Sequence, residues 1–203
     1  MAKQTFFNGN APRLEMEQGP RLEGLQPWIK ERVLWTFEQG MKIFAEVSMQ
    51  VAQYCDRYLL CGSLRRHAPG VHDLDLLATS RDMLRLIEAC RGLDDSGKLV
   101  TGARKISFGV AVCRGQEEDP EIFPVEIYLC CADNWYAQAI YRTGSKENNL
   151  MLHRKADSQG LTIDWDNGVL RSKQTGEMWK KIISEASLWK YLGLEYQEPK
   201  ERG

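Results

Sequence analysis

Residues 61–77 read CGSLRRHAPGVHDLDLL and combine a glycine-serine turn with two closely spaced aspartates. Gly62 has no side chain, so the backbone at this point can approach a phosphate group closely. Ser63 adds a hydroxyl and an amide, and a short helix opening here would present free N–H groups to an anion. Arg66, or its neighbour Arg65, can hold phosphate oxygens with its fork of donors. The turn therefore predicts a phosphate-binding loop.

The two aspartates, Asp73 and Asp75, alternate with leucines in a strand expected over residues 72–79. Side chains two apart on a strand project to the same side, so both carboxylates face one point. Such a pair suits two divalent cations about 4 Å apart, one activating a hydroxyl and the other neutralising a triphosphate. Glu126, in a strand expected over residues 122–130, is the candidate third carboxylate. The ordinary alternative stays open, because Asp-x-Asp pairs and single glutamates are common on exposed strand faces.

The remaining apolar periodicity predicts a mixture of helices and strands. Helices are expected over 28–54 with a division at Gly40, over 81–91 with Ser80 as cap and Gly92 as stop, after Asp133, after Ser145, and from Ser184 to Leu192 with Gly193 as stop. Further strands are expected over 58–61 and 105–113, and a hairpin around 166–168. Residues 1–27 are rich in glycine, proline and polar residues and predict a loose arm. The pattern indicates an α/β lobe that ends near residue 132. The remaining C-terminal residues form a separate region of helices and a hairpin.

The bulk composition narrows the class of protein. The chain has 203 residues and 43% hydrophobic composition, enough for one domain or two compact lobes. No window approaches the roughly 20 apolar residues of a membrane span, and the N-terminus does not resemble a signal peptide. The six cysteines include no Cys-x-x-Cys pair, so reduced and mostly packed thiols are expected.

A formal net charge of −1 argues against a protein held on nucleic acid by overall positive charge. Any DNA contact must come from a local patch, and residues 142–155 provide one. This segment contains Arg142, Lys146, Arg154 and Lys155, with His153 as a further donor, against Glu147 as its single acid. A solvated helix face is the alternative interpretation of the same cluster.

The segment from Cys61 to Leu77 resembles the palm motif of the nucleotidyltransferase superfamily, and within it that of the X-family DNA polymerases typified by DNA polymerase beta. Residues 141–145, YRTGS, resemble the family's nucleotide-binding turn, and Asn149 falls where the family places an Asn that contacts the incoming nucleotide. Residues 192–202, LGLEYQEPKER, resemble the family's closing Tyr-x-Glu-Pro-x-x-Arg signature. The resemblance runs from about residue 41 to the C-terminus and is to small phage and bacterial members.

This resemblance implies an α+β fold, in which a nucleotidyltransferase palm (a mixed or antiparallel sheet with helices on one face) is followed by a small α+β thumb. It implies a flexible arm over 1–27, a palm over 28–132 and a thumb over 133–203. The implied cofactors are two Mg²⁺ ions, for which Mn²⁺ can substitute, bound by Asp73, Asp75 and Glu126 as catalytic ligands. The implied nucleotide-binding residues are Gly62, Ser63, Arg66, Tyr141, Arg142, Thr143, Gly144, Ser145 and Asn149. The candidate DNA-binding residues are Lys146, His153, Arg154 and Lys155.

The activity implied is DNA-directed addition of deoxynucleotides to a primer 3′-hydroxyl, in the filling of short gaps during DNA repair. The expected partners are primer-template or gapped DNA and deoxynucleoside triphosphates, with the protein a monomer in the cytoplasm, near the nucleoid in a bacterial or phage host, and not in a membrane. Two alternatives remain: a nucleotidyltransferase that uses no template or acts on a small molecule, and an inactive palm that binds DNA or serves as an interaction module.

The chain also departs from the family pattern. Glu126 stands where the family usually has Asp, and Tyr141-Arg142 stands where it often has an aromatic pair at the sugar. His153 replaces an Arg that probes the template minor groove. The roughly 40 residues before the palm are too few for the helical lyase and fingers domains of larger relatives, so no deoxyribose-phosphate lyase activity is expected.

Overall fold

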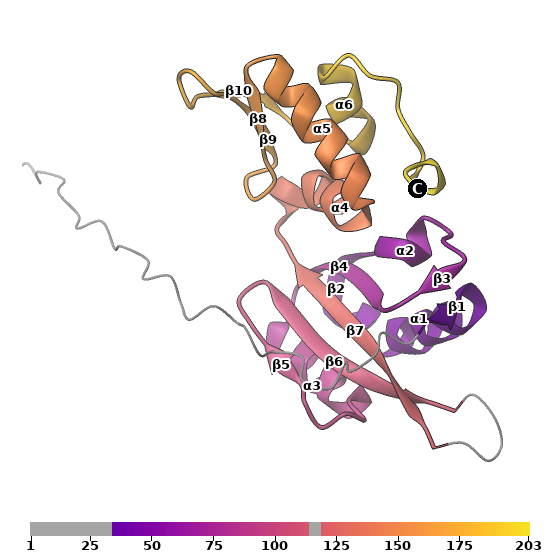
Figure 1. Cartoon of the computed structure of the whole chain (residues 1–203). Helices are drawn as coiled ribbons and strands as arrows, with labels where there is room; N and C mark the ends of the chain where they lie inside the picture. Colours follow the sequence, from indigo (N-terminus) through magenta and orange to yellow (C-terminus); the bar gives the residue numbers. More distant parts are fainter. Residues whose placement is uncertain (1–33, 114–118) are drawn as a thin grey trace, which may run out of the picture. The chain divides into compact units, whose positions relative to one another are not determined.

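The computed structural model describes residues 34–113 and 119–203 (Figure 1). The predicted N-terminal arm, residues 1–27, and the first residues of the helix expected over 28–54 lie outside this range. None of the helices within the described residues has both the length and the apolar character needed to cross a membrane.

A five-stranded mixed sheet forms the larger part of the fold. Its spatial order is β2 (Cys55–Leu60), β4 (Leu74–Ser80), β7 (Glu121–Leu129), β6 (Lys105–Val112) and β5 (Val100–Thr101). The β4 and β7 strands run parallel, and the other neighbouring pairs are antiparallel. The predicted α+β class with a mixed sheet is confirmed.

Alternating residues divide the sheet into two faces. The side chains of Leu76, Phe108 and Ile127 point to one face, where α1 (Phe37–Val51) and α3 (Met83–Leu93) cover them (Figure 1). These helices contribute buried residues at helical spacing, namely Ile43, Val47 and Val51 from α1 and Leu86 and Cys90 from α3.

The opposite face of the sheet carries two of the predicted carboxylates. Asp75 and Glu126 alternate with the core leucines and valines and therefore lie on this second face. At one end of the face, Leu77 packs against Trp135 and Ala139 of α4 (Trp135–Thr143).

A second hydrophobic core lies C-terminal to the sheet. Its buried residues come mainly from α4, α5 (Lys146–Ser158), α6 (Glu185–Tyr191), β8 (Leu161–Asp164) and β9 (Val169–Ser172). The exposed strand β10 (Met178–Lys181) pairs with β9 and completes a three-stranded sheet. Fully buried Trp189 and Leu170 belong to it. Serine side chains cap two of the helices, Ser145 on α5 and Ser184 on α6, as their positions in the sequence predict.

Several local predictions were wrong. Gly40 does not divide the first helix, because it is buried where Leu64 packs against the helix; a Cβ there would lie 2.7 Å from Leu64 Cδ2. The third helix is capped by Asp82, whose carboxylate accepts from the Arg85 amide, and it continues past Gly92. The sequence also gave no signal for the two-residue strands β1 (Trp35–Thr36), β3 (Gly70–Val71) and β5, or for β10.

Candidate active site

The Gly62 turn packs directly against the carboxylate of Asp75. Gly62 opens the four-residue helix α2 (Gly62–Arg65) with φ of 61°, and a Cβ at this position would lie 2.0 Å from Asp75 Oδ2. The Cys61 amide donates to the Asp75 carbonyl at 2.8 Å. Only a residue without a side chain fits this contact, so the predicted phosphate loop lies directly against one of the predicted carboxylates, Asp75.

Asp75 and Glu126 are register partners on the adjacent parallel strands β4 and β7. Residues paired in this way project to the same face, with neighbouring strands about 4.8 Å apart. Burial, with the nearby charges of Asp73 and Glu126, raises the pKa of Asp75 to about 7 despite the opposing effect of Arg142 and Arg66. A half-buried carboxylate crowded by two others is an environment that a cation would stabilise.

Glu126 does not complete a three-carboxylate cluster. One of its oxygens accepts from Lys105 Nζ of β6 at 2.8 Å, and the other accepts from the Tyr128 hydroxyl. Among the described residues, no group of three His, Cys, Asp or Glu side chains is arranged to hold a metal ion. Asp73 and Asp75 thus have the donor type and the charge that a divalent cation requires. The backbone of Glu126 is also suitably positioned, but its carboxylate is bound to Lys105 and Tyr128.

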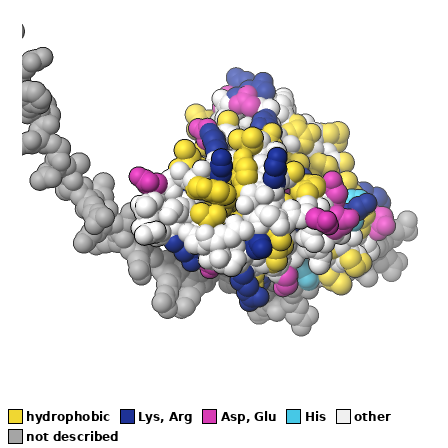
Figure 2. Space-filling view, turned by 90° about the horizontal axis from the view of Figure 1, so that it is seen from above, with side chains coloured by type: hydrophobic (Ala, Val, Ile, Leu, Met, Phe, Trp, Pro, Cys, Tyr) yellow, Lys and Arg dark blue, Asp and Glu magenta, His cyan; other side chains and the backbone are white. Residues whose placement is uncertain are grey.

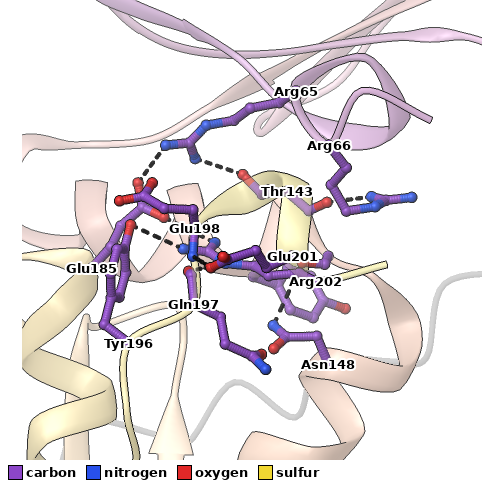
Figure 3. Close-up of polar contacts among 12 residues, drawn as sticks. Arg65, Arg66, Thr143, Asn148, Glu185, Tyr196, Gln197, Glu198, Glu201 and Arg202 are labelled. Carbon is purple, nitrogen blue, oxygen red and sulfur yellow. Dashed lines mark hydrogen bonds and ion pairs between the residues drawn. The ribbon is translucent and has the colours of Figure 1, made fainter.

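The phosphate-loop side chains differ in their contacts (Figure 3). Ser63 Oγ is buried and has no hydrogen-bond partner among the described residues. Arg66 donates through Nη1 to the Thr143 carbonyl, and burial lowers its pKa, although Asp75 acts in the opposite direction. Arg65 instead bonds Thr143 Oγ1 at 2.7 Å and Glu185 Oε1 at 2.6 Å. Of the two arginines, Arg66 is therefore the better candidate for a phosphate contact.

The predicted nucleotide turn, residues 141–145, is largely occupied by structural contacts. Thr143 is fully buried and accepts from Arg65, and Gly144 has φ of 70° with Arg66 beside it. Ser145 Oγ caps α5 by accepting from the Asn148 amide at 3.2 Å. These residues shape the turn, and their side chains make contacts within the protein.

At the start of this turn, Arg142 lies against the polar face of the sheet, whereas Tyr141 packs against Trp165. The guanidinium of Arg142 lies 3.8 Å from the ring centroid of Tyr128 and 4.9 Å from that of Tyr141. Its Nε is buried without a hydrogen-bond partner among the described residues. Asn149 donates to the Tyr141 carbonyl at 2.9 Å, which fixes the amide beside the turn.

The candidate DNA-binding residues on α5 do not share one face. Lys146 and His153 are seven apart and lie on the same side of the helix, whereas Lys155 lies nearer to its buried stripe. His153 Nε2 accepts from the indole N–H of Trp165 at 2.9 Å. Arg154 is exposed.

On the face of the molecule seen in Figure 2, Lys and Arg side chains are scattered among hydrophobic and acidic ones and do not merge into one basic patch. This distribution agrees with the near-neutral charge of the sequence. Phosphate contacts on this face would therefore be few.

Three residues near these sites were missed by the sequence interpretation. Tyr128 could have been found, since it lies two residues after Glu126 and so on the same face. Lys105 could not, because its approach to Glu126 depends on the pairing of β6 with β7. Trp165 packs 5.5 Å from Tyr141, and both line a pocket of about 540 Å³.

The residues of the closing Tyr-x-Glu-Pro-x-x-Arg signature hold the C-terminus in place (Figure 3). Arg202 is buried, donates to the Gln197 carbonyl at 3.0 Å and to the Tyr196 hydroxyl at 3.2 Å, and forms an ion pair with Glu185 at 2.9 Å. The Glu198 amide donates to Glu201 Oε2 at 2.8 Å. The motif therefore stabilises the C-terminal segment.

Residues 138–203 match the family model described as DNA polymerase beta thumb. The matched segment begins within α4 and includes the 141–145 turn, α5, the three-stranded sheet and the buried Arg202. The C-terminal segment of this chain is therefore similar to the thumb of DNA polymerase beta.

Proposed function

We propose that this chain is a small DNA polymerase that extends a primer 3′-hydroxyl and fills short gaps in damaged DNA. The observation that carries the proposal is the contact of Gly62 with Asp75, which joins a phosphate loop to a carboxylate pair. The thumb match of residues 138–203 supports the polymerase branch of the possible nucleotidyl transfers.

Each part of the site has a proposed role. Asp73 and Asp75 would hold two Mg²⁺ or Mn²⁺ ions, with Glu126 as the third ligand. When bound, such ions lower the pKa of an attacking hydroxyl and neutralise charge on a triphosphate. Gly62 and Ser63 receive the triphosphate, and the Ser63 hydroxyl has no hydrogen-bond partner among the described residues.

The arginines and the C-terminal turn contribute charge and position. Arg66 lies beside Asp75 and Gly144, so its guanidinium is placed to neutralise phosphate oxygens. Tyr141, Arg142 and Asn149 form the wall on which the sugar and base of the nucleotide rest. Lys146 and Arg154 are exposed donors for the DNA backbone.

Primer extension on gapped DNA tests the proposal. Asp75→Ala should reduce extension more than about a hundredfold, since even loss of an outer-shell partner of a metal ligand costs about ten- to a hundredfold. Asp56→Ala is the matched control, because Asp56 lies on the same sheet but forms an exposed ion pair with Arg81. Retention of extension by Asp75→Ala would remove the catalytic assignment.

The same assay separates the templated reaction from an untemplated one. The inserted base should follow the template at each gap length, and a base that ignores the opposite strand would identify a template-independent transferase. Comparison of deoxy- and ribonucleotides reports on Arg142, which stands where the family often has an aromatic side chain.

A second function, DNA binding without catalysis, is favoured by the hydrogen bonds of Glu126 to Lys105 and Tyr128. In that case the palm would bind DNA but show no divalent-dependent increase in nucleotide affinity. Nucleotide binding measured with and without Mg²⁺ distinguishes the two functions.

A further inference from the structure

Both carboxylate oxygens of Glu126 are held by side chains of the sheet itself. Lys105, the first residue of β6, donates to Oε1, and Tyr128, two residues along β7, donates to Oε2. The partner strand β4 carries Asp75 in register with Glu126 on the other side. The carboxylate thus has two alternative sets of partners: the Lys105–Tyr128 pair and a cation bound at the aspartates.

We propose that Lys105 and Tyr128 form a clamp that holds Glu126 out of the metal site in the metal-free protein. Lys105 and Tyr128 are then positioning residues, because each acts through the carboxylate that it holds. This inference rests on the proposed function, since it assumes that the aspartates bind divalent cations.

The two halves of the clamp differ in how firmly they are held. Tyr128 is packed between cations, with Arg142 at 3.8 Å and Lys105 at 5.9 Å from its ring centroid. Its hydroxyl donates to Glu126 Oε2, and its ring is half-buried on β7. This half of the clamp is held by packing as well as by its hydrogen bond.

Lys105 is the residue of the clamp that can release Glu126. Its side chain is 42% exposed, whereas that of Glu126 is 14% exposed. An ion pair with one well-solvated partner is weak, and a lysine on a flexible stem can return to water at little cost. A divalent cation at the aspartates can therefore compete with Lys105 for Glu126.

The clamp predicts a specific gain in metal affinity when Lys105 is removed. Manganese binding to the free protein, without DNA or nucleotide, can be titrated by electron paramagnetic resonance. Lys105→Met should tighten manganese binding by about three- to fivefold, the equivalent of a weak solvated ion pair. Tyr128→Phe, which changes no charge, should also tighten it.

Removing any positive charge near an acidic site increases cation affinity through long-range electrostatics. Substitution of a neighbouring basic residue that does not hold Glu126 controls for this effect. Arg104 is adjacent in sequence but pairs with Asp166 and makes no contact with Glu126 among the described residues. Arg104→Met should therefore change manganese affinity much less than Lys105→Met. Equal effects of the two substitutions would overturn the clamp.

A Glu126→Gln background provides the second control. If Lys105 acts by holding Glu126, then once the carboxylate is gone Lys105→Met should raise manganese affinity no more than Arg104→Met does. A larger gain that persists in this background would overturn the proposal, and so would the absence of manganese binding in every variant.

The outcomes separate the clamp from the polymerase proposal. Primer extension by the wild type with unchanged manganese affinity in Lys105→Met would leave the polymerase proposal standing and overturn the clamp. Tighter binding in Lys105→Met without extension by the wild type would support the clamp and count against the polymerase.

Discussion

The carboxylate of Glu185 joins two arginines, and its replacement by glutamine measures how much this junction stabilises the protein. Oε1 lies 2.6 Å from Arg65 Nη2, and Oε2 lies 2.9 Å from Arg202 Nη1. The Arg202 side chain is fully buried, and those of Glu185 and Arg65 are 14% and 18% exposed. Glu185→Gln preserves the shape but leaves two guanidinium groups without their counterion.

Removing one partner of a buried ion pair costs about 3 to 5 kcal/mol. Arg202 keeps its bonds to Gln197 and Tyr196, and the glutamine retains one acceptor oxygen. We therefore expect a loss at the lower end of that range, about 3 kcal/mol in the free energy of unfolding. In a domain of this size the melting temperature should fall by about 6 to 12 °C.

Urea unfolding followed by circular dichroism and tryptophan fluorescence measures this loss. Glu88→Gln is the control, because Glu88 pairs with Arg91 and both side chains are at least 60% exposed. That surface pair should contribute no more than about 0.5 kcal/mol. A loss below about 1 kcal/mol in Glu185→Gln, or equal losses in both variants, would refute the reasoning that burial makes the junction strong.

Three further changes test other parts of the fold. Gly193→Ala should reduce the free energy of unfolding by roughly 1 kcal/mol, and Gly62→Ala should reduce it by at least about twice as much. Both glycines have positive φ, but an added Cβ would lie within 4 Å of another atom only at Gly62. Equal losses in equilibrium unfolding would contradict this close approach. Burial raises the pKa of Asp94, but bonds from a serine and backbone amides outweigh it and lower the pKa. A carboxyl group whose pKa is lower in the folded than in the unfolded protein stabilises the fold at pH values above its unfolded pKa. Asp94→Asn should therefore reduce the free energy of unfolding by about 1 to 2 kcal/mol at pH 7. This difference from the wild type should vanish as the pH falls from about 4 through the folded pKa, and a difference that stays constant would contradict the prediction. Trp165→Phe removes the hydrogen bond to His153 and should reduce the free energy of unfolding by about 1 kcal/mol. In a double-mutant cycle, adding His153→Phe to Trp165→Phe should cause no further loss of stability.

The strands that carry the site could be predicted because burial on one face imposes a period of two. Leu74 and Leu76 alternate with Asp75 in β4, and Val125 and Ile127 alternate with Glu126 in β7. Each strand thus reveals which of its residues face away from the core. By contrast, all four residues of β10 are exposed, so no alternation marks it.

Pairing between strands could not be predicted in the same way. That Asp75 lies opposite Glu126 depends on the parallel register of β4 and β7, and the approach of Lys105 to Glu126 depends on the next strand along. A strand's own sequence indicates which face a residue occupies but not which neighbour it meets. The carboxylates were therefore found by pattern, while the two side chains that hold Glu126 were not.

The charge balance of the polar face explains why cations of the protein gather there. Neighbouring carboxylates on strands about 4.8 Å apart repel each other strongly when partly buried. Lys105 contacts Glu126, and the charges of Arg142 and Arg66 both act on Asp75. Each of these cations also belongs to another contact, Arg142 with Tyr128 and Arg66 with Thr143, so their positions are set by the protein as a whole. The acids of this face are therefore offset by charge from three separate places, namely β6, the residue after α2 and the 141–145 turn.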